Sequence, residues 1–113
     1  MGESDNLKYV DIAKTIELLE ATKELLSDPY VWTQGAFCTA DGRMCVLGAL
    51  NYCSALQPYY LYLQALNALN AALGKPDSVR GILVDWNDAE NRCQDEVLSL
   101  FVKAIDAIAS GPV

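Results

Sequence analysis

The sequence predicts a mainly α-helical protein, a small helical bundle with a short β-hairpin inserted after its first helix. Apolar residues recur at helical spacing in several separate segments, and an Asp-Gly pair, a typical hairpin turn, lies between the first two of them. The 113 residues, of which 52% are hydrophobic, are enough to build one core. We therefore expect a single domain over residues 1–113, with loose ends at about 1–9 and 110–113.

The first predicted helix runs from Val10 to Ser27. Its apolar residues recur at helical spacing, and most charged residues lie on the opposite face. The apolar stripe consists of Ile12, Ile16, Leu19 and Leu26. Asp28-Pro29 should end the helix, because the residue before a proline is pushed out of the helical region and proline cannot continue the hydrogen-bond ladder.

The hairpin is expected between Ala36 and Val46, because Asp41-Gly42 can supply the positive φ angles of a two-residue turn. Opposite residues on antiparallel strands lie close enough for a disulfide, so Cys38 and Cys45 would be able to form one. A reducing cytosol disfavours its persistence. The expected register pairs three residues before the turn with three after it: Ala40 with Arg43, Thr39 with Met44, and Cys38 with Cys45.

Two further helices are predicted in the middle of the chain. The first should run from about Val46 to the break at Gln57-Pro58. The second, from Tyr59 to Leu73, is apolar around most of its circumference and is therefore expected to be central. Gly74 is well placed to cap it, because glycine readily adopts the left-handed conformation found at helix ends. Lys75-Pro76-Asp77 should then form a turn.

The segment that follows is ambiguous. Residues 78–84 fit a short helix capped by Asp77 or Ser78, but their apolar residues would also serve as a strand. The helix is the favoured alternative. Residues 87–92 contain one apolar side chain, that of Ala89, and are expected to form a loop.

A final helix is expected to begin near Cys93 or Gln94. With that start, Asp95 and Glu96 lie in its first turn, where negative charge interacts favourably with the helix dipole. Its apolar stripe consists of Val97, Phe101, Ala104, Ile105 and Ile108.

The charge balance restricts the partners of the protein. The formal net charge is −7, from 15 acidic and 8 basic residues, and the bases are scattered, so neither nucleic acid nor a membrane is an expected partner. Residues 1–6 are polar and acidic, unlike a secretory signal, and the apolar stretches are interrupted before the length of a membrane span. We expect a cytoplasmic monomer or homodimer whose partner is a small polar molecule or another protein.

Several kinds of chemistry lack their usual residues. The chain has no histidine, the commonest general base and metal ligand, and no glycine-rich loop of the nucleotide-binding types. Its four cysteines lack the C-x-x-C spacing of structural zinc sites, so no metal and no cofactor are expected. Cys53 and Cys93 are expected to be small buried residues or helix caps.

Cys45 is the best candidate for a reactive group. It lies where the expected hairpin meets a helix N-terminus, and the dipole of that helix would lower the pKa of the thiol. The alternative is a buried structural cysteine, which the absence of a partner base favours.

Two aromatic and polar clusters form the candidate binding site. Trp32 with Gln34, and Trp86 with Asn87 and Asp88, combine rigid apolar walls with oriented hydrogen-bonding groups, as ligand pockets do. The alternative is structural: the tryptophans fill the core while the amides and the carboxylate bond backbone groups of the loops.

Two further features suggest close packing or an interaction surface. Gly48 lies inside a predicted helix, where glycine costs about 1 kcal/mol relative to alanine, so another helix, a tryptophan or a ligand is expected to approach it closely. An aromatic group near the junction of the two middle helices is expected to be surface cover, although such a patch can also seat a partner protein. It consists of Tyr52, Tyr59, Tyr60 and Tyr62.

The motifs W-T-Q-G, G-x-x-C-x-x-G-A-L and W-N-D together resemble an uncharacterised family of small bacterial and bacteriophage proteins, a domain of unknown function. The resemblance implies no activity. We therefore expect a non-catalytic binding or regulatory protein. The alternatives are a small enzyme that uses Cys45 or Asp88, and a phage-encoded protein that sequesters or inhibits a host component. The motif positions are Trp32, Gln34, Gly35, Gly42, Cys45, Gly48, Ala49, Trp86, Asn87 and Asp88.

Overall fold

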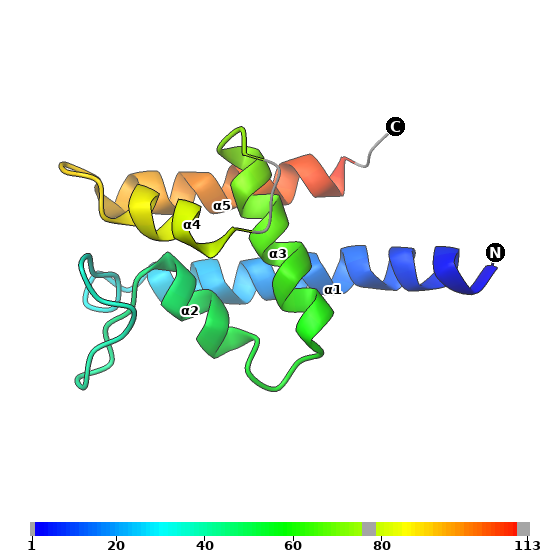
Figure 1. Cartoon of the computed structure of the whole chain (residues 1–113), viewed down its shortest axis with the longest axis horizontal. Coiled ribbons are helices and arrows are strands. Elements are labelled where there is room, and N and C mark those ends of the chain that lie inside the picture. The colour runs from blue at the N-terminus through cyan, green and yellow to red at the C-terminus, as the bar shows by residue number, and fades with distance from the viewer. Residues whose placement is uncertain (1, 76–78, 111–113) are drawn as a thin grey trace.

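A computed structural model describes residues 2–75 and 79–110, with side chains described from Ile12 onward. Within these ranges the chain forms a bundle of five helices, and Figure 1 shows α1 and α5 side by side in opposite directions with α3 crossing both. No helix of the described part is long and apolar enough to cross a membrane. The helices are α1 Gly2–Leu26, α2 Val46–Cys53, α3 Tyr59–Ala72, α4 Arg80–Asn87 and α5 Gln94–Ala109.

The first helix ends where proline chemistry predicts. α1 stops at Leu26, and Asp28 stabilises the following turn by accepting a hydrogen bond from the Tyr30 amide at 2.9 Å. Leu19 and Leu26 of the predicted stripe are fully buried. The expected looseness of residues 1–9 stays a prediction, and the end of the chain at 111–113 lies outside the described residues.

The third helix is central, as its apolar circumference predicts. α3 packs against all four other helices and buries both faces of its middle turns. Gly74 adopts a φ of +80° after the helix. The Lys75 amide donates to the Asn70 carbonyl at 2.8 Å and the Gly74 amide to the Ala71 carbonyl at 2.9 Å, so the predicted glycine cap is confirmed as a Schellman motif. The Pro76-Asp77 part of the predicted turn lies outside the described residues.

The ambiguous segment is a helix and not a strand. α4 extends further than predicted, so that Trp86 and Asn87 lie in its last turn and the loop begins at Asp88. The proposed caps Asp77 and Ser78 lie outside the described residues. α5 begins at Gln94 as predicted, and the Glu96 carboxylate accepts a hydrogen bond from the backbone amide of Cys93 at 3.1 Å. Cys93 is therefore a cap residue.

The predicted β-hairpin is wrong. In the described ranges the chain between α1 and α2 forms isolated β-bridges, with Met44 pairing with Trp32 on one side and Cys38 on the other, and no sheet. The chain turns one residue earlier than expected: the Gly42 amide donates to the Thr39 carbonyl at 3.1 Å, and Gly42 has a φ of +89°. This is the pattern of a three-residue connection, in which the glycine follows the turn.

The earlier turn changes the register of the cysteines. Cys38 lies opposite Met44 instead of Cys45, and all four cysteines of the chain are free. Cys38 is exposed while Cys45 is buried, so the predicted disulfide pair is not brought together. α2 then begins at Val46 as predicted but ends at Cys53, four residues before the Gln57-Pro58 break.

Candidate functional site

Asn87, at the end of α4, lies at the centre of the hydrogen bonds of the candidate site. Its side chain is fully buried. Its Oδ1 accepts hydrogen bonds from the Trp32 indole at 2.7 Å and from the Val46 backbone amide at 3.0 Å. Its Nδ2 donates to the Thr33 carbonyl at 3.0 Å and to Oδ1 of Asp88 at 2.9 Å. One amide thereby joins the loop after α1, the start of α2 and the end of α4, and we call this arrangement the Asn87 junction.

Gln34 and Asp88 extend the Asn87 junction to the backbone. The Gln34 amide donates to the carbonyls of Asn87 and Ala89, each at 2.9 Å. These carbonyls lie at the C-terminal end of α4, where the helix itself provides no partner. Oδ1 of Asp88 accepts a further hydrogen bond from the Gly35 amide at 2.9 Å. These contacts with backbone groups are of the kind that the structural alternative predicts.

Trp86 is held by a residue that sequence analysis did not single out. The Arg92 guanidinium lies 4.0 Å from the centroid of the Trp86 ring, and its Nε donates to the Trp86 carbonyl at 2.8 Å. Arg92 also forms an ion pair with Glu96 at 3.4 Å. Trp86 therefore anchors the loop between α4 and α5. The sequence did not indicate a role for Arg92, because a basic residue in a polar loop is usually a solvated surface residue.

A small pocket of about 110 Å³ lies beside the Asn87 junction, and we call it the Asp88 pocket. It brings together the two residues proposed as catalytic, Cys45 and Asp88, but neither tryptophan lines it. Asp88 is exposed, and both hydrogen bonds that its carboxylate makes within the described residues end on Oδ1. Its Oδ2 is thus available to a donor from outside. The pocket is lined by Gly35, Ala36, Phe37, Cys45, Val84 and Asp88.

Cys45 does not have the low pKa that its position predicted. The residue is 2% exposed, and burial raises the pKa of its thiol above the ordinary value. Hydrogen bonds from the Gly48 and Leu47 amides oppose this shift, and the charge of Asp88 adds to it. The Gly48 amide lies 3.3 Å from Sγ, so the thiol serves as the N-cap of α2. Burial and a raised pKa are what the alternative of a buried structural cysteine predicts, because desolvation outweighs the helix N-terminus.

The close approach expected at Gly48 is confirmed, but its partner is backbone. A Cβ at this position would overlap the carbonyl oxygen of Phe37 and lie 3.0 Å from the carbonyl carbon. The same oxygen accepts a hydrogen bond from the Cys45 amide at 3.2 Å. The glycine therefore lets the loop rest directly on α2 at Phe37, one of the residues that line the Asp88 pocket.

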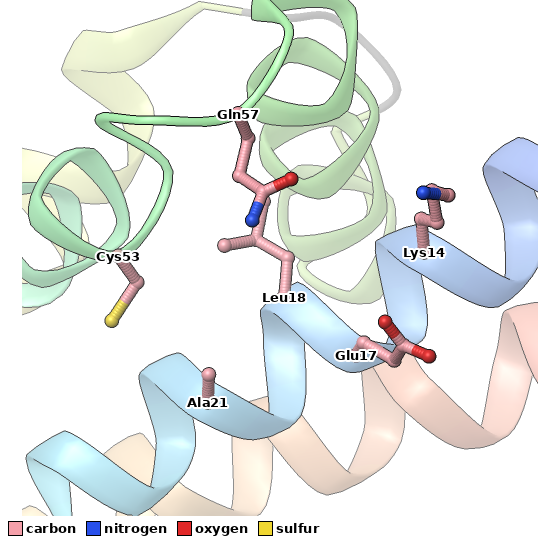
Figure 2. Close-up of a pocket in the computed structure, with 6 residues that line it drawn as sticks. All are labelled: Lys14, Glu17, Leu18, Ala21, Cys53 and Gln57. Carbon is pink, nitrogen blue, oxygen red and sulfur yellow. The ribbon is translucent and has the colours of Figure 1, made fainter.

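A larger pocket of about 330 Å³ lies between α1 and the end of α2. Figure 2 shows the Cys53 sulfur pointing towards α1 on one side and the Lys14 and Glu17 side chains on the other. Burial raises the pKa of the Cys53 thiol, so the pocket does not present a reactive thiolate at neutral pH. It is lined by Lys14, Glu17, Leu18, Ala21, Cys53 and Gln57, none of them a predicted site residue.

Comparison with known proteins assigns the chain to a family. The model of a family described as "Family of unknown function (DUF6197)" matches residues 12–107. No curated protein and no solved structure matches the chain.

Proposed function

The chain belongs to DUF6197, a family of unknown function, and we propose that it is a small non-catalytic binding protein that binds its ligand at the Asp88 pocket. The observation that carries this proposal is that the two oxygens of the Asp88 carboxylate have different roles. Oδ1 of Asp88 is used by the fold, while Oδ2 has no hydrogen bond within the described residues. An oriented acceptor fixed at the edge of an apolar pocket is the typical arrangement of a ligand site.

The lining of the pocket favours a small group that carries N–H donors. Phe37, Ala36 and Val84 supply apolar walls, and the carboxylate of Asp88 supplies a negatively charged acceptor. The net charge of −7 attracts cations over longer distances. About 110 Å³ is below the size of sites for drug-sized ligands, so the group is an ammonium or amide head of a small polar molecule or of a partner side chain.

An enzyme is the second candidate, because Cys45 and Asp88 line the same pocket. A cysteine nucleophile reacts as the thiolate. Burial raises the pKa of Cys45, and the negative charge of Asp88 raises it further, so the neighbour that would have to act as a base disfavours the reactive form. We therefore favour binding over catalysis.

The proposal includes a cytoplasmic location and a regulatory role. Four free thiols are typical of proteins in reducing compartments. A phage-encoded protein that captures a host component would be a special case of the same function, with a lysine or amide side chain of the host protein in the Asp88 pocket.

Two substitutions at Asp88 separate its two roles. Asp88→Asn keeps an Oδ1 that can accept from the Gly35 amide, so we expect nearly unchanged stability but loss of cation binding. Asp88→Ala removes the acceptor for both Gly35 and Asn87, and we expect a loss of about 1 kcal/mol, at the low end of the usual range because Asp88 is exposed.

Binding is measured by titrating ¹⁵N-labelled protein with methylammonium chloride, with sodium acetate at equal ionic strength as the control. The amides of Gly35 and Phe37 should shift in the wild type with methylammonium alone, and not in Asp88→Asn. Native mass spectrometry of protein purified from cells tests in parallel for a retained ligand. Equal responses of wild type and Asp88→Asn, or no response of either, would contradict the proposed site.

A further inference from the structure

The connection between α2 and α3 is an uncharged, exposed surface on a strongly acidic protein. Between Arg43 and Lys75 the sequence contains no charged residue, although the chain has a net charge of −7. Figure 1 shows this connection projecting from the bundle between the labels α2 and α3. Among the described side chains, eight large hydrophobic ones are exposed, and four of these lie in the nine residues 52–60: Tyr52, Leu56, Tyr59 and Tyr60.

Leu56 is the most exposed of these side chains. It is 99% accessible, which is unusual for a leucine in a chain that buries most of its other leucines. Tyrosine and arginine are enriched at the centres of protein interfaces, whereas charged residues such as glutamate and lysine are depleted there. The composition of this surface is therefore that of an interface.

A pocket of about 300 Å³ lies directly beside Leu56, and we call it the tyrosine pocket. The rings of Tyr59 and Tyr62 are stacked with centroids 5.6 Å apart. The Arg80 guanidinium lies 5.5 Å from the Tyr62 centroid and donates to the Tyr59 hydroxyl at 2.8 Å, which holds both rings in place. The pocket is lined by Asn51, Ser54, Ala55, Gln57, Tyr59, Tyr62 and Arg80.

We infer that the occupant of the tyrosine pocket is Leu56 of a second copy of the chain, in a two-fold symmetric homodimer. A two-fold interface requires a projecting side chain and its receptor on the same surface patch, so that each copy supplies both. Ala55 and Gln57, the neighbours of Leu56, line the pocket, so this chain meets that requirement. A preformed pocket also reduces the ordering cost of association.

The charge distribution is compatible with a second copy as the occupant. Two chains of net charge −7 repel each other when acidic faces approach, and this cost is reduced here because no described residue that lines the tyrosine pocket carries a carboxylate. Among the described residues that line the tyrosine pocket, Arg80 is the one with a charge, and its guanidinium already makes a cation–π contact with Tyr62 of the same chain. The tyrosine pocket and the Asp88 pocket share no lining residue, so dimerisation is independent of the proposed ligand binding.

Sedimentation equilibrium from micromolar to millimolar concentration tests the dimer. We expect the wild type to dimerise. Leu56→Lys should raise the dissociation constant of the dimer at least about tenfold, because the variant loses the apolar contact of Leu56 with the tyrosine pocket of the other copy. The lysine also places a second positive charge opposite Arg80. The matched control is Val102→Lys, which places the same charge at an exposed apolar position on α5 and should leave the dissociation constant unchanged.

A second measurement does not depend on the variants. In a sample that mixes isotope-labelled and unlabelled wild type, contacts between subunits give nuclear Overhauser effects from the Leu56 methyl groups to the Tyr62 ring. A wild type that stays monomeric throughout the concentration range would overturn the inference, even if Leu56 binds a different protein. A dimer whose intersubunit contacts exclude Leu56 would overturn it equally.

Discussion

Asn87→Ala will lower the free energy of unfolding by about 3 kcal/mol or more. The substitution removes four hydrogen bonds at a fully buried position and leaves the Trp32 indole and the Val46 amide without their acceptor. A buried donor that loses its partner costs roughly 1–3 kcal/mol, and the Thr33 carbonyl adds to the cost. The loss is large because three segments of the chain depend on one side chain.

Urea denaturation followed by circular dichroism measures this loss. The matched control is Asn67→Ala on the exposed face of α3, which should be neutral or slightly stabilising because alanine is the better helix former. If both variants unfold at the same urea concentration as the wild type, Asn87 does not hold the loop, and the site residues are free for another role.

Gly48→Ala should cost about 2 kcal/mol, although alanine is intrinsically better in a helix. The new methyl group would overlap the Phe37 carbonyl, which is backbone and cannot rotate away. The loop must therefore lift from α2, and the hydrogen bond from the Cys45 amide to that carbonyl is weakened. Overpacking of this kind costs about 1–3 kcal/mol.

Gly81→Ala is the control for the Gly48 experiment. A Cβ at Gly81, in α4, meets no described heavy atom within 4 Å. The same substitution should therefore raise stability, by up to about 1 kcal/mol. Thermal unfolding of the two variants is expected to move in opposite directions. A stabilised Gly48→Ala variant would show that the loop does not rest on α2.

The elements that could be predicted are those with strong local signals. Periodic apolar residues and the Asp28-Pro29 break predict a first helix and its end, although α1 begins at Gly2, eight residues before the predicted Val10, and the apolar circumference of α3 predicts its central place. Gly74 and Gly48 were also informative, because each marks a conformation or a contact that a larger residue does not permit.

The hairpin could not be predicted because an Asp-Gly pair fits more than one turn. It can occupy the two central positions of a hairpin turn, or it can end a three-residue connection, and only the second places Cys38 opposite Met44. The observed turn is held by contacts within the loop, such as the hydrogen bonds from the Tyr30 hydroxyl to Asp41 and from the Arg43 amide to the Thr39 hydroxyl, and by contacts of the loop with the end of α4. Trp32 and Gln34 form hydrogen bonds with residues that lie 53 to 55 positions later in the sequence. A local sequence pattern does not reveal such contacts.

The candidate site shows the same distinction between local and distant effects. The polar residues Gln34, Asn87 and Asp88 were recognisable from the sequence as a group, but their partners are backbone groups of other segments. At Cys45 the local feature, a helix N-terminus, suggested a lowered pKa. Burial by distant parts of the chain raises it instead.

A double-mutant cycle between Trp32 and Asn87 tests the Asn87 junction most directly. Trp32→Phe removes the indole donor, Asn87→Ala removes its acceptor, and the two residues are joined by a 2.7 Å hydrogen bond across 55 positions of sequence. We predict that the losses of unfolding free energy are not additive, with a coupling of about 1 kcal/mol or more. Additive losses in the double variant would contradict the junction.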